Sequence, residues 1–171
     1  MAIEQTREWE IARRVLEPVH ARRTGISHFQ HVREGVRILQ AVGAPLISQR
    51  AFALHPLIQK TDDFVNNLAM LEGCDARAVA LAVEYRWVAN LGVRQRVREN
   101  AWQITLSSFP EVNQMLLADK VQNRKDFLLH FPPSHPDFDE LVRYFGCWME
   151  ALGVSEERYR ELAASAQKAV D

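Results

Sequence analysis

The sequence predicts an all-α protein, and the spacing of its apolar residues is the main reason. Apolar residues recur every three or four positions along nearly the whole chain, as they do at Leu141, Phe145 and Trp148. No segment shows the sustained alternation of apolar and polar residues that is typical of a strand with one buried face. With 171 residues, 47% of them hydrophobic, the chain is long enough to form one complete core. We therefore expect one helical domain over residues 1–171, with about seven helices.

The first two helices are indicated by apolar spacing and by residues that start and stop helices. Apolar positions at helical spacing begin at Trp9 and continue to Val19, which predicts the first helix. Ser27 has the side chain to cap a second helix that opens at His28. Gly43 favours the end of that helix, because glycine readily adopts the left-handed conformation that often follows a helix.

A third helix is predicted over residues 48–60, although Pro56 interrupts its pattern. Proline removes a backbone donor and disfavours helical geometry at the residue before it. We therefore expect His55 to lie at a kink or at a junction between two helices. A further apolar run begins near Asp62, and Gly73 is expected to end it.

Further helices are predicted in the second half of the chain. Residues 78–100 have the apolar content of a helix, and Pro110 is placed to begin the next one, since a missing N–H costs little at the first helical position. That helix carries Asp119. Residues 130–136 are rich in proline and are expected to form a loop, and Ser155 is expected to cap the last helix.

Composition limits the class of protein and its partners. The chain has 21 basic and 22 acidic side chains, so no strong field attracts nucleic acid or an acidic membrane surface, and we expect neither as a partner. Cys74 and Cys147 are the only cysteines, which excludes a disulfide scaffold and a four-thiolate zinc site. Apolar runs are too short for a membrane span. The N-terminal segment is charged and lacks an apolar block, so we expect no secretory signal and a cytoplasmic location.

Asp119 stands among apolar residues and therefore needs a partner. Burying an unpaired carboxylate costs several kcal/mol. The partner can be a basic side chain such as the adjacent Lys120, or it can be a metal ion, and the sequence leaves both open. Asn123 lies four residues later and shares a helix face with Asp119.

His31 and His55 are the candidate partners of Asp119 in a metal site. Imidazole and carboxylate ligands suit Zn, Mn or Fe, and two histidines with one carboxylate leave coordination positions open for water or phosphate. His28 is a further partner or a competing ligand. The alternative is that the histidines are packed and hydrogen-bonded core residues. We expect one divalent metal ion.

Three segments, HVREGVRILQAVGA, AFALHPLIQKTDD and LLADKVQNRKDF, resemble the motif helices of the HD-domain superfamily of metal-dependent phosphohydrolases. The likeness is greatest to the alarmone-hydrolase (RelA/SpoT-type) branch, and EYRWVAN with the last segment is also similar to small phage-encoded proteins of this type. The resemblance implies a single HD-like helical bundle in which His31, His55 and Asp119 bind the metal. It also implies that Lys120 and Asn123 line a nucleotide pocket.

The chain departs from the pattern of that superfamily at two places. Pro56 stands where an aspartate follows the second histidine, and Gln59 with Lys60 replaces an acidic pair of the alarmone-hydrolase branch. Asp62 and Asp63 follow closely, but they face another direction on a helix. Gln59 is therefore the residue that we expect to position a water molecule.

Two polar residues of the middle segment are further candidates for binding a nucleotide. Arg86 and Asn90 are four residues apart, so one helix face can present both to a pocket, and Tyr85 can stack on a base. The alternative is that these are ordinary residues of a partly buried helix.

Two functions follow from these residues. The leading hypothesis is a metal-dependent nucleotide phosphohydrolase-like protein that acts on nucleoside polyphosphates or alarmones. The alternative is a degenerate HD fold that binds a nucleotide or a host protein without turnover, and Pro56 and Gln59 favour it. A homo-oligomer and a purely structural helical protein are also left open.

Overall fold

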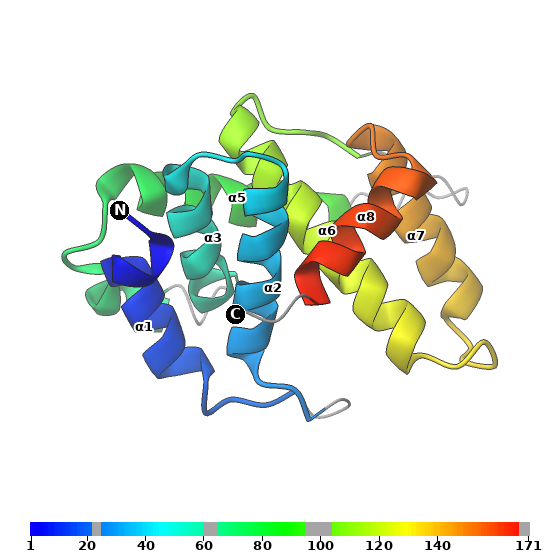
Figure 1. Cartoon of the computed structure of the whole chain (residues 1–171), viewed down its shortest axis with the longest axis horizontal. Coiled ribbons are helices and arrows are strands. Elements are labelled where there is room, and N and C mark those ends of the chain that lie inside the picture. The colour runs from blue at the N-terminus through cyan, green and yellow to red at the C-terminus, as the bar shows by residue number, and fades with distance from the viewer. Residues whose placement is uncertain (22–24, 60–64, 95–103, 168–171) are drawn as a thin grey trace.

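The computed structural model describes residues 1–21, 25–59, 65–94 and 104–167. Within these ranges the chain forms helices and no strand, which confirms the predicted all-α class and approximately matches the predicted number of helices (Figure 1). The α-helices are α1 (Arg7–Leu16), α2 (His28–Ala41), α3 (Leu46–Ile58), α5 (Ala76–Arg94), α6 (Pro110–His130), α7 (Phe138–Ala151) and α8 (Glu156–Gln167), and two short 3-10 helices, η1 (Ile3–Gln5) and η2 (Leu68–Leu71), accompany them.

The helix starts follow the predicted caps. The Ser27 hydroxyl accepts a hydrogen bond from the Phe29 amide at 3.1 Å, and the Ser155 hydroxyl accepts one from the Arg158 amide at 3.1 Å. Pro110 occupies the first turn of α6, as its missing N–H predicts. These local signals set where the helices that carry the site begin.

Helix α3 is at the centre of the packing. It contacts α1, α2, α5 and α6, and Figure 1 shows it beside α2. Most of its side chains are buried, and those of Phe52 and Leu54 are fully buried. A helix that is apolar nearly all round is typical of the middle of a bundle. A ligand residue on α3 therefore lies in the hydrophobic core.

Pro56 does not divide α3. The sequence predicts a kink or a junction at His55, but the helix runs from Leu46 to Ile58 without a break, so the predicted junction is wrong. Pro56 removes the N–H that would bond the Phe52 carbonyl four residues earlier. The Nδ1 atom of His55 lies 2.6 Å from that carbonyl and donates in place of the missing amide.

Helices α2 and α3 approach closely at Gly35. A Cβ atom at this position would overlap the ring of Phe52, so only glycine leaves room for that ring. Phe52 in turn lies against both candidate histidines, with ring centroids 5.8 Å from His31 and 4.4 Å from His55. The glycine therefore sets the separation of the two helices that carry the histidines.

None of the described helices is both long enough and apolar enough to cross a lipid bilayer.

Candidate metal centre

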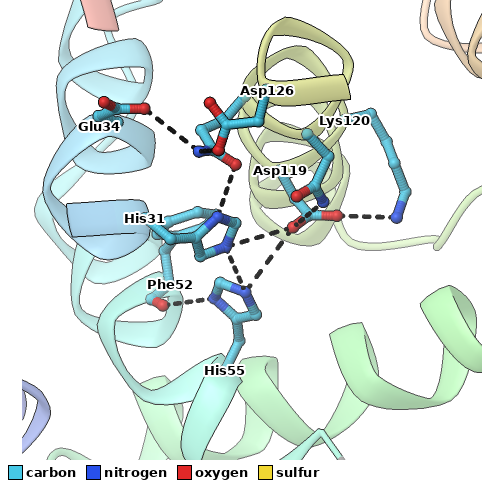
Figure 2. Close-up of polar contacts among 9 residues, drawn as sticks. His31, Glu34, Phe52, His55, Asp119, Lys120 and Asp126 are labelled. Carbon is cyan, nitrogen blue, oxygen red and sulfur yellow. Dashed lines mark hydrogen bonds and ion pairs between the residues drawn. The ribbon is translucent and has the colours of Figure 1, made fainter. Parts of the chain in front are cut away.

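Three helices bring His31, His55 and Asp119 to one point (Figure 2). The two Nε2 atoms lie 3.2 Å apart, and the Oδ1 atom of Asp119 lies 3.4 Å from that of His31 and 3.8 Å from that of His55. A tetrahedral ion bound at about 2.0–2.1 Å holds neighbouring ligand atoms about 3.3 Å apart. The three measured distances lie around this value, so the predicted trio has the spacing of a metal-binding set.

The hydrogen bond of His55 decides which of its ring nitrogens faces the centre. A backbone carbonyl can only accept, so Nδ1 carries the proton that it donates to the Phe52 oxygen. In the neutral ring the lone pair is then on Nε2, which faces His31 and Asp119. Pro56 makes this arrangement available, because it leaves the Phe52 carbonyl without an amide donor.

A buried glutamine orients His31 in the same way. The Gln122 amide nitrogen donates to Asp126 at 2.6 Å and to Glu34 at 3.2 Å, which turns its carbonyl oxygen toward His31. That oxygen lies 2.6 Å from Nδ1 of His31 and accepts its proton. Figure 2 shows this chain of contacts running from Glu34 and Asp126 to the histidine. Metal-binding histidines commonly donate their second nitrogen to a carbonyl or a carboxylate in this manner.

Two lone pairs and one carboxylate oxygen therefore meet at the centre. With both imidazoles neutral, no proton lies between the Nε2 atoms of His31 and His55, and the pair repel each other unless a cation or an added proton separates them. This convergence is the strongest chemical sign of a metal site in the described part of the chain.

The pKa shifts agree with this arrangement of charges. Burial and the charge of His31 lower the pKa of His55 to about 3, so this ring is neutral at neutral pH, as a ligand must be. Burial lowers the pKa of His31, but the Asp119 carboxylate and Gln122 outweigh burial, and the net pKa is raised. The Asp119 carboxylate therefore favours positive charge at the point where the three side chains meet.

Asp119 is paired with the basic side chain that the sequence offered, and it also faces the two histidines. Burial raises its pKa, but Lys120 and the two histidines outweigh burial, and its pKa lies well below the ordinary value. The Lys120 ammonium contacts Oδ2 at 2.7 Å, while the Asn123 amide donates to Oδ1 at 2.9 Å. The ion pair therefore uses one oxygen and leaves the other directed at the histidines.

Tyr85 adds a buried hydroxyl beside the centre. Its side chain is fully buried, and its ring centroid lies 4.8 Å from that of His55, which is the packed position that the alternative interpretation predicts. Burial and the nearby Asp119 carboxylate raise its pKa well above the ordinary value. The Asp119 carboxylate interacts with this hydroxyl, so Tyr85 belongs to the buried surroundings of the centre.

A cavity of about 420 Å³ opens onto the centre. Three predicted site residues, Gln59, Lys120 and Asn123, line it together with the metal trio. Arg86 and Asn90 are outside this lining, and the Asn90 amide instead donates to the Gln59 backbone carbonyl at 3.2 Å. The predicted contact residues on α6 and at the end of α3 therefore line the cavity, whereas the two on α5 do not.

Other residues singled out in the sequence have different positions. His28 lines the cavity but is not part of the metal-binding group. Lys60, Asp62 and Asp63 lie outside the described residues, as does the end of the predicted segment 78–100.

Gln122 and the hydroxyl of Tyr85 are parts of the site that the sequence patterns do not predict. A glutamine between Val121 and Asn123 gives little indication of a role in the site. Its burial becomes evident only in the fold, where its side chain is 2% exposed. The role of Pro56 had a clear local signal, since a proline always frees the carbonyl four residues before it in a helix.

The chain was compared with protein-family models, curated proteins and solved structures, and none of them matches it.

Proposed function

We propose that this chain is a metal-dependent phosphohydrolase-like protein of the HD type that acts on nucleoside polyphosphates, alarmones included. His31, His55 and Asp119 hold one Zn, Mn or Fe ion in this proposal. The observation that carries it is the meeting of two imidazole lone pairs and a carboxylate oxygen, with each Nδ1–H directed away to a carbonyl oxygen.

The residues of the trio fit a catalytic centre better than a structural one. Three protein ligands leave coordination positions open, which is the arrangement of catalytic metal sites. A bound divalent ion would polarise a phosphoryl oxygen and lower the pKa of a coordinated water. The cavity of about 420 Å³ gives a substrate access to these positions.

Lys120 supplies the positive charge that attracts a phosphate, and Asn123 orients Asp119. Burial lowers the pKa of Lys120, but Asp119 and Tyr144 outweigh burial, so the pKa is raised and the side chain is a permanent cation at neutral pH. Lys120 lines the cavity beside the metal trio. The Asn123 amide, held by Asp119, orients the carboxylate, and Gln59 offers an amide to a water molecule.

Binding without turnover is the second candidate, and a specific observation favours it. The carboxylates that line the cavity are already engaged, Asp119 with Lys120 and Asp126 with Gln122 and Lys125. Pro56 stands where the resembled family has an acid. The described residues of the cavity therefore include no carboxylate that is available as a general base.

Metal analysis of protein purified without chelator tests the proposal. We expect about one Zn, Mn or Fe ion per chain in the wild type, and a loss of the ion in His31→Ala and Asp119→Asn. His28→Ala is the matched control, since His28 lines the same cavity outside the trio, and it should retain the ion. A metal-free wild type, or a loss of metal in the control, would overturn the assignment.

Phosphate release separates the two candidates. The metal-loaded protein is offered nucleoside di- and triphosphates and alarmones, and free phosphate and pyrophosphate are measured. Release that disappears in Asp119→Asn supports a hydrolase. Saturable binding of the same compounds without release supports the second candidate.

A further inference from the structure

A second cavity adjoins the metal cavity. Its volume is about 390 Å³, and it shares four lining residues with the first: Lys120, Asn123, Asp126 and Tyr144. Its other walls come from the C-terminal half of α6, the residue after α6, and the facing side of α7: Phe127, His130, Phe131, Leu141 and Phe145. The two cavities therefore meet at the residues that follow Asp119 on α6.

The walls of this second cavity are mainly aromatic. Phe127 is the centre of the group, with ring centroids 5.3 Å from Phe131 and 5.6 Å from Phe145 in tilted arrangements. Aromatic walls favour a flat aromatic occupant, because stacked and tilted ring pairs gain energy beyond the burial of area. We call this second cavity, with the lining given above, the aromatic cavity.

The polar residues of the aromatic cavity are gathered at its junction with the metal cavity and at its rim. Lys120 and Asn123 stand at the junction, and His130 is exposed at the outer wall. Lys120 and Asn123 are bonded to Asp119 on the side of the metal trio, so the polar groups lie at one end of this cavity and the rings at the other. The edge of a heterocyclic base can hydrogen-bond to them while its faces lie against the rings.

We propose that the aromatic cavity receives the base of a nucleotide whose phosphates lie at Lys120 and the metal trio. The inference rests on the proposed function and deepens it, since it identifies where the base of the substrate binds. The Lys120 cation lies where the two cavities meet, and its charge is complementary to that of the phosphates. It would therefore lie between the bound phosphates and the bound base. The chain then selects nucleotides over simpler phosphate compounds.

Three probes, of which only one carries a base, test the inference by calorimetric titration of the metal-loaded protein. The probes are adenosine diphosphate, ribose 5-phosphate and inorganic pyrophosphate. We expect the nucleotide to bind roughly ten-fold or more tightly than the two probes without a base, since stacking of one base commonly contributes this much. Equal affinity for the nucleotide and pyrophosphate, or no binding of any probe, would overturn the inference.

Variants at Phe131 locate the effect. Phe131→Leu keeps an apolar side chain but removes the ring, and we expect it to weaken the nucleotide roughly ten-fold while pyrophosphate binding stays unchanged. The matched control is Leu129→Ala, because Leu129 is exposed in the last turn of α6, two residues before Phe131, and lies outside the lining. Equal weakening of both probes by Phe131→Leu, or unchanged nucleotide binding, counts against the base subsite.

Titration of adenosine in the absence of metal distinguishes failure of this inference from failure of the proposed function. Binding of the free nucleoside that is lost in Phe131→Leu retains the aromatic cavity as a base site even where no metal binds. A protein that binds metal and pyrophosphate but shows no preference for the nucleotide retains the metal function and loses the inference.

Discussion

At the scale of single residues, Pro56 has the least expected consequence. It fixes the proton of the neighbouring His55 ring, because the Phe52 carbonyl that it frees accepts the hydrogen bond of His55. A proline inside a helix usually costs about 3 kcal/mol, partly through the lost hydrogen bond. Here a side chain replaces that bond, and the replacement directs Nε2 of His55 toward His31 and Asp119.

Substituting Pro56→Ala tests this role. The new amide N–H competes with His55 for the Phe52 carbonyl, so the proton of the ring is less firmly held on Nδ1. We expect the helix to be retained and the metal affinity to fall by roughly ten-fold, which competition with a chromophoric chelator measures. Nitrogen NMR of the imidazole should show a mixture of tautomers in the variant, and a single tautomer with unchanged affinity would contradict the role.

At the scale of elements, the approach of α2 to α3 decides whether the two histidines meet. Gly35 admits the Phe52 ring, and this ring lies against both imidazoles. Gly35 lies in the interior of α2, where a glycine costs stability relative to alanine, so its presence there indicates a packing requirement.

We expect Gly35→Ala to destabilise the fold by about 1–3 kcal/mol and to weaken metal binding, because the added methyl group displaces Phe52. Urea denaturation and metal analysis measure the two effects. Gly146→Ala on α7 is the control: a Cβ there meets no atom within 4 Å, so we expect a gain of about 0.5–1 kcal/mol from helix propensity. Equal effects of the two substitutions would show that packing at Gly35 is unimportant.

The elements also show what a sequence can and cannot predict. Ser27 and Pro110 mark helix starts through contacts with the next few residues, so local rules were sufficient. The meeting of His31, His55 and Asp119 was expected from the order of their motifs, and the fold brings them together. Gln122 was not predicted, since its partners lie on other turns and other helices. The positions of Arg86 and Asn90 depend on the rotation of α5, which spacing alone does not determine.

At the scale of the whole molecule, a buried ion pair joins the N-terminal helix to the central one. Glu8 is fully buried and accepts two hydrogen bonds from Arg50, at 2.9 and 3.0 Å, and one from the Asp75 amide at 2.7 Å. Burial raises the pKa of Glu8, but the hydrogen bonds of Arg50 and Asp75 outweigh it, and the net pKa lies below the ordinary value. A carboxyl group with a lowered pKa in the folded state stabilises the fold above its unfolded pKa, and this stabilisation is lost as the pH falls through the folded pKa.

We therefore expect Glu8→Gln to lower the free energy of unfolding at pH 7 by about 3 kcal/mol, because Arg50 loses its main buried partner. The variant should also lose less stability than the wild type between roughly pH 5 and pH 3, since it has no proton to take up at this position. Urea denaturation across this pH range measures both effects. Glu10→Gln, at an exposed pair with Arg7, is the control, and a similar loss there would contradict the prediction.

The three candidate ligands come from α2, α3 and α6, and the first and last of them are separated by about half of the chain. A cation that binds all three would act as a reversible cross-link across the hydrophobic core, and it would stabilise only the folded chain. The supply of metal in the surroundings would then set the resistance of this protein to heat and to proteases, independently of any substrate.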